Sequence, residues 1–531
     1  MTVQAEIEQV LGCAQTTLIR TSLVPLGTHN METFYLAIDV GTGSVRAALV
    51  DAKGVIRSLA AREHEQIVPR YGWSEQRPLD WWAGAVSSIR EVLASVPGAA
   101  AQIAAICACG QMHGTVLIDA DGELTRDTAP LWNDKRTLAQ VASFRSRNDA
   151  ASYLPRTANP ATPAWPGFKL QWLKEHEPVA YERASTVFMP KDYVNFRLTG
   201  ERACDWTDAS TTFLMNPTER TWSQTMLDAL ELDGSKLPPI RAPLDILGSV
   251  SREAASETGL WAGTPVLVGG GDYPVSVLGS GVYAAGLASD ITGTSSIITV
   301  IADTPMLHPE VSNLATCEGL WGRFMLLDSG GDAMRWARRA FHENALSYEA
   351  VAQKAAEAPV GSEGLLFLPY LTGERLGEHS NSRAQFFGIA AKHGLAHLHR
   401  AVLEGVAFGV RRHIGLIESA GVTMERLVAA SGGAKAALWL EIKASMYRTP
   451  ILVPKEVECG VIGCAVLAAT AQGQFARLGD AVDAFVHFER EVQPDPRASD
   501  TYDRMMPIFE RLYVHSQQFY DDLDRLSGAS A

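Results

Sequence analysis

The chain has 531 residues, 47% of them hydrophobic and 20% charged, with a formal net charge of −14. This length is too great for one hydrophobic core and predicts two or three globular domains. The acidic balance argues against a general affinity for nucleic acid or anionic membranes, and no run of about 20 apolar residues predicts a membrane span, so we expect neither partner.

The first strand-like run begins just after Met31. We therefore expect residues 1–33 to be an appended or disordered extension, because chain ends that lack apolar periodicity seldom join a core. Met31 is a candidate for the natural start of the protein.

Residues 34–50 predict a β-hairpin with a glycine-rich tip. The apolar run Phe34–Ile38 is followed by Asp39-Val-Gly-Thr-Gly-Ser44 and then by the apolar run Val45–Val50. Apolar runs bounded by glycine-rich turns are typical of β-strands. The chain then turns at Asp51–Gly54 into another extended stretch, so we expect the fold to open with a β-meander.

The middle of the chain predicts a strand, a helical region and a second strand. Gln102–Ala108 is an apolar run that ends at Gly110-Gln-Met-His-Gly114, where a loop should leave the end of a sheet. Trp and Leu recur at three- and four-residue steps from about 135 to 235, which is typical of helices. The next strand-like run, Thr264–Val268, leads into Gly269-Gly-Gly-Asp272.

A short repeat divides the chain into halves. Asp290-Ile-Thr-Gly-Thr-Ser295, followed by the apolar run Ser296–Ile301, repeats the pattern of Asp39–Ser44 and its following strand. The repeat predicts a duplicated fold with one phosphate-binding hairpin in each half, although two ordinary β-turns would give the same pattern. We expect residues 34–282 and 283–531 to be the two domains.

The second half continues with one strand and several helices. Leu427–Ser431 predicts a strand that feeds the glycine-rich turn Gly432-Gly-Ala-Lys435. Residues 436–447 have an amphipathic helical pattern, Cys459–Ala465 opens a helix of small residues suited to close packing, and the tail after about Pro496 is expected to be helical.

The two glycine-rich turns favour phosphate binding. Phosphate requires backbone N–H donors and an approach free of Cβ atoms, and both Gly41–Ser44 and Gly293–Ser295 supply these. Asp39 would place a carboxylate beside the phosphates, where Mg²⁺ can bridge them. The chain has neither a GxxxxGK[ST] P-loop nor a GxGxxG motif after its first strand, so the nucleotide site is of another kind.

Asp272 is the best candidate for a catalytic base. It follows three glycines at the end of a strand, so its side chain can project into open space. Phosphoryl transfer needs positioning, charge neutralisation and one carboxylate that accepts the hydroxyl proton. A local hydrogen-bonding role within a glycine-rich turn is the alternative.

The loop at Gly110–Gly114 is a candidate sugar-binding site. Flanking glycines let His113 stand in a cleft and bind sugar hydroxyls, while Met112 packs on the carbon skeleton. Trp132, and with it Asn133, Asp134 and Arg136, could line the same cleft, because sugars stack on aromatic rings. A structural loop histidine and a core tryptophan are the alternatives.

In this order, the motifs resemble the FGGY family of carbohydrate kinases and, within it, the xylulokinases. The resemblance extends from about Tyr35 to Arg525, and Gly110-Gln-Met-His-Gly114 is its most specific motif. The other matching segments are Tyr35–Ser44, Tyr71–Gln76, Asp80–Trp82, Leu131–Asp134 with Arg136, Thr207–Ser210, Gly269–Asp272, Pro369–Arg375 and Gly432–Lys435.

The resemblance implies an α/β fold of two actin-like ATPase (ribonuclease H-like) domains, each a mixed sheet flanked by helices, with an interlobe cleft. It implies an ATP-dependent transferase that uses Mg²⁺ and phosphorylates a terminal hydroxyl of a ketopentose, converting D-xylulose to D-xylulose 5-phosphate. The first domain would bind the sugar and carry the catalytic base, and the second would bind most of the nucleotide.

The resemblance also assigns roles to individual residues. Asp272 would be the base and would contact the sugar together with Met112 and His113, beside Trp132, and Asp39 would organise Mg²⁺. The candidate nucleotide-contacting residues are Thr42, Gly43, Ser44, Gly293, Thr294, Gly330, Gly432, Gly433 and Ala434.

Four sites depart from the family pattern. Tyr273 stands where Asn or Gln is common and would crowd the pocket, and Lys135 replaces a common Gly. Ser431 replaces the first of three glycines, and Ser445-Met446 replaces an Asp-Val pattern. The first two place the identity of the sugar in question. The alternatives are another pentulose such as ribulose, a tetritol or other polyol such as erythritol, and a non-catalytic actin-like ATP-binding sugar sensor.

The seven cysteines indicate the redox compartment of the protein. Their number is odd and their spacing is scattered, which favours free thiols in a reducing compartment. We therefore expect a cytoplasmic protein, with sugar and ATP as its small-molecule partners and a homodimer as the assembly to test.

Overall fold

The computed structural model describes residues 32–374 and 379–527. Apart from its last two residues, the expected N-terminal extension therefore lies outside the described residues. The described residues from Thr33 onward form one compact unit, to which every described helix and strand belongs. None of these helices has both the length and the apolar character that crossing a bilayer requires.

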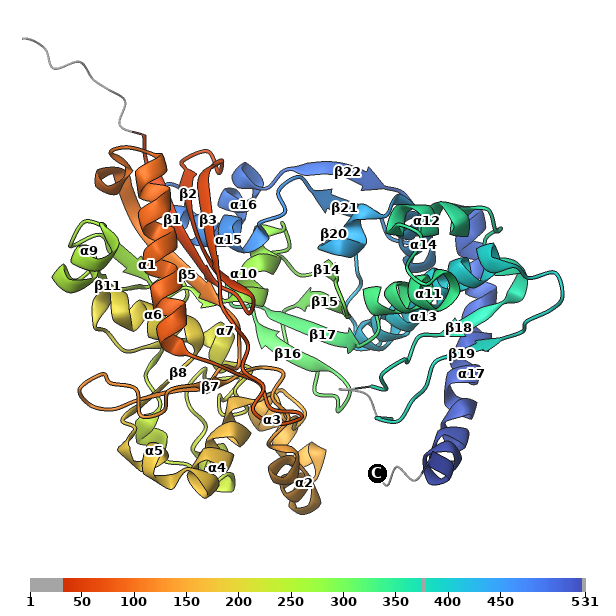
Figure 1. Ribbon diagram of the computed structural model, residues 1–531, viewed down its shortest axis with the longest axis horizontal. Coiled ribbons are helices and arrows are strands. Elements are labelled where there is room, and N and C mark those ends of the chain that lie inside the picture. The colour runs from red at the N-terminus through yellow and green to blue at the C-terminus, as the bar shows by residue number, and fades with distance from the viewer. Residues whose placement is uncertain (1–31, 375–378, 528–531) are drawn as a thin grey trace, which may run out of the picture. The chain divides into compact units, whose positions relative to one another are not determined.

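The first large sheet has seven strands and carries the first glycine-rich hairpin at its centre (Figure 1). β1 pairs antiparallel with β2 and parallel with β5, so both of its edges are hydrogen-bonded, and its apolar run is buried. In spatial order the strands are β11 (Ile246–Ser249), β12 (Pro265–Leu267), β5 (Ile103–Gly110), β1 (Phe34–Val40), β2 (Ser44–Asp51) and β3 (Ile56–Glu63), and the short β13 (Gly270–Gly271) pairs with the end of β5.

The second seven-stranded sheet is built in the same way around the second hairpin. β14 pairs antiparallel with β15 and parallel with β20. In spatial order the strands are β16 (Ser312–Ala315), β17 (Trp321–Leu327), β15 (Ser296–Ala302), β14 (Leu287–Thr292), β20 (Arg426–Ala430), β21 (Ile451–Pro454) and β22 (Phe488–Val492).

The two sheets share one pattern of strand order and direction. The order β3-β2-β1-β5-β12 corresponds to β17-β15-β14-β20-β21, with two antiparallel pairings followed by two parallel ones in each case. The repeat of Asp39–Ser44 at Asp290–Ser295 therefore marks a structural duplication, and the predicted fold class is confirmed.

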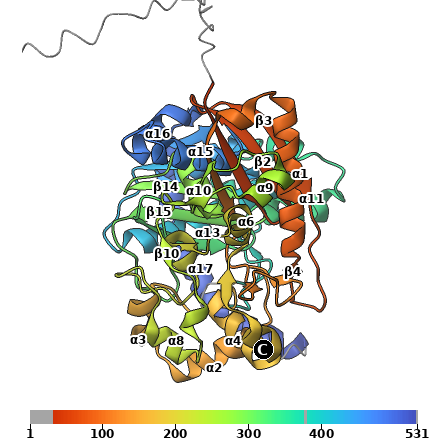
Figure 2. The same cartoon turned by 90° about the vertical axis from the view of Figure 1, so that its left-hand side faces the viewer.

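Helices cover both faces of the first sheet. Leu36, Ile38 and Val40 pack in a core with α1 (Pro78–Ser95) and α6 (Pro190–Thr199), whereas Tyr35 and Ala37 pack with α15 (Cys459–Ala471) on the other face. Figure 2 shows α1 and α15 on opposite sides of the strands. The alternation follows from the two-residue period of a strand.

One face of the second sheet packs against a larger group of helices. Strand residues such as Ile298, Leu427 and Ile451 share a core with this group. Its members are α11 (Gly331–His342), α12 (Tyr348–Ala356), α13 (Leu395–Glu418), α14 (Ala437–Tyr447) and α17 (Pro496–Ser527).

Two helices cross in backbone contact between the sheets. They are α10 (Asp272–Gly279) and α15. A Cβ atom added to Gly279 would lie 1.9 Å from the carbonyl oxygen of Cys459, and one added to Gly463 would lie 2.0 Å from that of Val275. Only glycine fits these contacts, which brings the start of α15 beneath β1 and beside Asp39.

The predicted helical region near 135–235 holds a series of short helices. Besides α6, they are α2 (Leu138–Arg147), α3 (Ala150–Thr157), α4 (Pro166–His176), α5 (Pro178–Arg183), α7 (Trp206–Ala209) and α8 (Gln224–Ala229). Two further short helices, α9 (Arg252–Thr258) and α16 (Leu478–Phe485), lie outside that region. Two-stranded sheets join β4 (Glu75–Gln76) to β7 (Ala129–Pro130), β6 (Val116–Ile118) to β8 (Thr186–Phe188), β9 (Cys204–Asp205) to β10 (Ile240–Arg241) and β18 (Leu366–Leu368) to β19 (Gln385–Phe387).

Candidate active site

A cavity of about 310 Å³ lies where the two large sheets face one another. The first half contributes Met112, His113, Trp132, Asp272 and, at the hairpin tip, Thr42. All five of these residues are among the predicted site residues. The other lining residues are Gln111, Thr162, Ala164, Trp165, Thr211 and Tyr273 from the first half, with Ser295, Ile297, Leu314, Phe324 and Leu326 from the second.

Hydrogen bonds hold the first hairpin tip against the cavity. Thr42 accepts a bond at its carbonyl oxygen from Gln76 Nε2 (2.6 Å) and at Oγ1 from Trp132 Nε1 (3.1 Å). Its hydroxyl donates to Gln111 Oε1 at 3.2 Å. A Cβ atom added to Gly43 would meet nothing within 4 Å, so the tip leaves open space for a ligand.

Two carboxylates converge because their strands are neighbours. Asp39 is in register with Cys109, and Gly271, which precedes Asp272, is in register with Gly110. Burial raises the pKa of Asp272 to about 7, the nearby Asp39 adds to the rise, and the Tyr273 N–H opposes it.

Asp39 is also held in place by its neighbours. Arg46, opposite it on β2, donates from Nη1 to Asp39 Oδ2 at 3.0 Å. Burial raises the pKa of Asp39 against the lowering effect of Arg46. Two adjacent acids with raised pKa values form a site that a cation would stabilise.

A buried polar cluster supports the strand that carries Asp272. Gly271 N–H donates to Thr207 Oγ1 at 2.9 Å, and Thr207 N–H donates to Asp205 Oδ1 at 2.6 Å. Lys191 Nζ lies 2.7 Å from Asp205 Oδ2 and also pairs with Asp192. The Thr207–Ser210 motif therefore acts beneath the site, and the ammonium group of Lys191 fills the space among its acids.

The second hairpin tip packs against the start of α11. Gly331 N–H donates to Gly293 O at 2.9 Å, and Asp332 N–H donates to Thr294 O at 3.0 Å. A Cβ atom added to Gly330 would lie 2.5 Å from the backbone of Ser295, so only glycine permits this approach. The predicted residues Gly293, Thr294 and Gly330 thus lie together.

The turn at Gly432–Ala434 lies beside the same hairpin. A Cβ atom added to Gly433 would lie 2.6 Å from Thr292 Cβ. Ser431, which replaces a family glycine, has φ 70° and ψ −161°, a conformation that glycine adopts far more easily. Ala434 lines a second cavity of about 410 Å³, together with Lys435, Lys455 and Arg490.

Some residues that were expected in the cavity lie elsewhere. Asp134 and Arg136 do not line this cavity but form a buried ion pair, with Arg136 Nη2 2.8 Å from Asp134 Oδ2. Lys135 is exposed and also lies outside the cavity lining. Tyr273 does line it, and its hydroxyl lies 2.6 Å from Thr299 Oγ1 on β15, so this ring spans toward the second sheet.

Several lining residues were not predicted from the sequence. Thr211 immediately follows the Thr207–Ser210 motif and could have been included on that ground. Trp165 immediately precedes α4 in the first half, and Phe324 lies on β17 in the second half. No local pattern distinguishes these two residues from core aromatics.

Comparisons with known proteins agree with this architecture. The family described as FGGY family of carbohydrate kinases matches through its N-terminal domain at residues 34–279 and its C-terminal domain at residues 288–472. The chain is 30% identical over 497 residues to the xylulose kinase of Staphylococcus epidermidis (strain ATCC 12228), covering 92% of this chain and 98% of that protein.

Solved structures extend the comparison to the fold. The xylulose kinase from Rhodospirillum rubrum has a TM-score of 0.87 at 29% identity, covering 92% of this chain and 99% of that one. The gluconate kinase from Lactobacillus acidophilus has a TM-score of 0.88 at 25% identity, covering 93% and 100%.

Two matched sheets with two glycine-rich hairpins, together with the match to both domains of a carbohydrate kinase family, define an actin-like sugar phosphotransferase that uses ATP. The chain belongs to the FGGY family of carbohydrate kinases.

Proposed function

We propose that this protein transfers the γ-phosphate of ATP to a terminal hydroxyl of D-xylulose, giving D-xylulose 5-phosphate. The observation that carries the proposal is the placement of Asp272 beside Asp39 in a cavity walled by Met112, His113 and Trp132. The xylulose kinase relatives, similar over nearly their whole length, favour a ketopentose over the other sugars.

The cavity residues have complementary tasks in this reaction. Asp272 accepts the proton of the attacking hydroxyl, while the carbon skeleton of the sugar packs against Met112 and Trp132. Water is excluded by the apolar wall from the second half, which includes Phe324 and Leu326. The site thereby favours transfer to the sugar over hydrolysis.

The nucleotide would extend along the second half from one glycine turn to the next. We propose that the phosphates lie between the tips at Thr42–Ser44 and Gly293–Thr294, with Gly330 nearby, and that adenosine packs at Gly432–Ala434. The close packing of the second-half turns at Gly293, Gly330 and Gly433 on one another supports this path. Asp39, beside Asp272, fits a Mg²⁺ site, and the ion would neutralise charge on the phosphates.

The domain boundary and the assembly also remain proposals. We place the boundary at residues 282 and 283, between the end of α10 at Gly279 and the start of β14 at Leu287. A cytoplasmic location and a homodimer are kept as predictions.

The function is tested by measuring ADP release with a panel of D-xylulose, D-ribulose, erythritol and gluconate. We expect the highest kcat/KM with D-xylulose. A preference for erythritol or gluconate would replace the proposed substrate, and ATP binding without turnover of any sugar would favour the non-catalytic sensor.

The pH dependence should report the titration of Asp272. Its pKa of about 7 makes the carboxylate, the form that accepts a proton, dominant only above that pH. With the preferred sugar, log(kcat/KM) should rise with a slope of about one below pH 7 and level off above it. A profile that is flat from pH 5 to 8 would contradict the role of Asp272 as the base.

Replacing His113 by alanine should weaken sugar binding and relax the choice of sugar. Loss of a neutral hydrogen bond of about 0.5–1.5 kcal/mol predicts a KM raised roughly two- to tenfold, with a small change in kcat. Steady-state kinetics across the same panel measure both effects. Unchanged KM values would remove His113 from the sugar site.

A further inference from the structure

His113 is held in a backbone conformation that few side chains adopt. Its φ is 66°, in the left-handed region, which a residue other than glycine occupies only when its surroundings fix it there. The His113 carbonyl oxygen accepts a bond from Lys169 Nζ at 2.7 Å and a longer one from Thr115 Oγ1 at 3.5 Å. Lys169 is thus the principal polar partner of this carbonyl.

One helix end holds His113 from two sides. Trp165 immediately precedes α4, and its ring meets the imidazole of His113 edge to face, with centroids 4.9 Å apart. Lys169 lies four residues later, on the same face of the helix. The start of α4 therefore contacts both the ring and the carbonyl group of His113.

The hydrogen bonds of the ring assign its tautomer. The Thr211 hydroxyl donates to Asp208 O at 3.1 Å, so its oxygen accepts the N–H of His113 Nε2, 3.0 Å away. Nδ1 is then an acceptor without a hydrogen. It is buried and has no protein partner among the described residues. Burial lowers the pKa of His113 well below its usual value, so the ring stays neutral.

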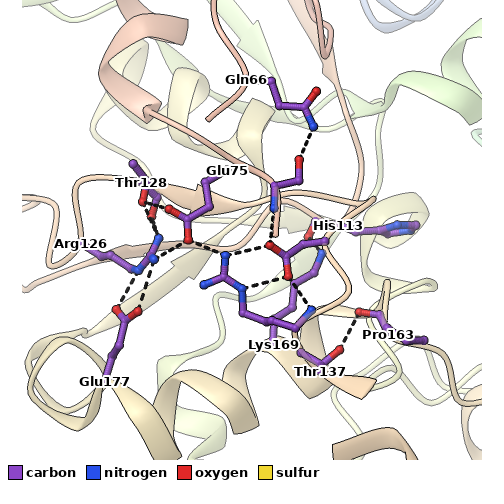
Figure 3. Close-up of polar contacts among 12 residues, drawn as sticks. Gln66, Glu75, His113, Arg126, Thr128, Thr137, Pro163, Lys169 and Glu177 are labelled. Atoms are coloured by element: carbon purple, nitrogen blue, oxygen red, sulfur yellow. Dashed lines mark hydrogen bonds and ion pairs between the residues drawn. The ribbon is translucent and has the colours of Figure 1, made fainter. Parts of the chain in front are cut away.

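Lys169 is fully buried beside the ion pairs shown in Figure 3. Asp134 and Arg136 are the charged groups that act on it, and burial, with Arg136 adding and Asp134 opposing, lowers the pKa of Lys169 to about 7. Arg136 pairs in turn with Glu75 and Asp134. Protonated Lys169 is therefore favoured by the unfolded chain, and its geometry points to a role at His113.

We propose that Lys169 is a positioning residue, which holds the His113 carbonyl so that the imidazole ring keeps its place in the wall of the sugar cavity. The inference rests on the proposed function, because it concerns the sugar of the same site.

The test combines two substitutions in a double-mutant cycle. Lys169→Met keeps most of the length of the side chain and removes the donor, and His113→Ala removes the ring that Lys169 would position. We expect K169M to raise the sugar KM about fivefold or more while the KM for ATP stays within about twofold. In the H113A background, the same substitution should change the sugar KM by less than about twofold.

Unfolding separates positioning from a structural role. The pKa of Lys169 is lower in the folded than in the unfolded state, so unfolding takes up a proton between pH 7 and the ordinary lysine pKa of 10.5. K169M removes this cost but also leaves the His113 carbonyl without its principal donor, so the two effects oppose each other and the unfolding midpoint at pH 7.5 should change little, even as sugar binding weakens. A lower midpoint together with equal losses in both backgrounds would overturn the proposal.

Lys236→Met is the matched control. Lys236 is also buried and donates to a backbone carbonyl, that of Ala184 at 2.6 Å, away from the sugar cavity. K236M should leave the sugar KM unchanged, and an equal rise in K236M would overturn the inference. If K169M does not fold, Lys169→Gln, too short to span the same distance, takes its place with the same criteria.

The outcomes keep the two proposals distinct. Wild-type turnover of the four-substrate panel tests the proposed function by itself. An active wild type with additive K169M and H113A effects overturns only the positioning role.

Discussion

Replacing Asp272 by alanine should lower kcat by about two to four orders of magnitude, because general-base removal typically costs 10²–10⁴. Sugar affinity should change little by comparison, since Met112, His113 and Trp132 still line the cavity. The nucleotide turns belong to other elements, so the KM for ATP should be nearly unchanged. Single-turnover kinetics, which isolate the chemical step, measure the loss.

Asp272→Asn is the companion variant, and it separates chemistry from folding. The pKa of Asp272 is raised from 3.8 to about 7 in the folded state, so unfolding releases a proton between these values and stability falls as pH rises through them. Asparagine carries no charge and avoids this loss. D272N should therefore be inactive yet have a higher unfolding midpoint than the wild type at pH 8. Near-normal turnover by either variant would contradict the assignment of the base.

The sequence was most informative where local chemistry and chain order agree. Three glycines before Asp272 leave few structural uses for that position, and the hairpin Asp39–Ser44 recurs at Asp290–Ser295. Both patterns are local, so they can be identified without tertiary contacts. The confirmed duplication of strand order follows from the second of them.

Other features depend on contacts that a linear pattern does not contain. Phe324 reaches the cavity only because the second sheet faces the first. Asp134 and Arg136 follow a cavity residue closely in sequence, but their side chains point into a buried ion pair. Lys169 looks like any lysine in a short helix, and its burial became apparent only in the structure.

The two repeated acids have diverged in their surroundings. Asp39 pairs with Arg46, whose side chain is 35% exposed, and lies near Asp272, which lines the cavity. Asp290 is buried, and Lys443 Nζ donates to its Oδ2 at 2.8 Å and to Thr292 Oγ1 at 2.7 Å. We therefore expect Asp39 to take part in phosphoryl transfer and Asp290 to support the strand that precedes Gly293.

Replacing Lys443 by methionine should destabilise the fold by about 3–5 kcal/mol, because it leaves Asp290 buried without its partner. Equilibrium denaturant unfolding measures the change. The double variant K443M with Asp290→Asn should recover a large part of the loss, since the uncompensated charge is then absent. The loosened hairpin tip at Gly293 should also raise the KM for ATP more than the KM for the sugar.

Arg46→Met is the matched control for that experiment. It removes the partner of the other repeated acid, but from an ion pair that solvent reaches, so its cost in unfolding free energy should stay near ~1 kcal/mol or less. Equal destabilisation by R46M and K443M would show that the two acids contribute equally to the stability of their hairpins. A large loss confined to K443M would place the structural acid in the second half and leave Asp39 free to act at the phosphates.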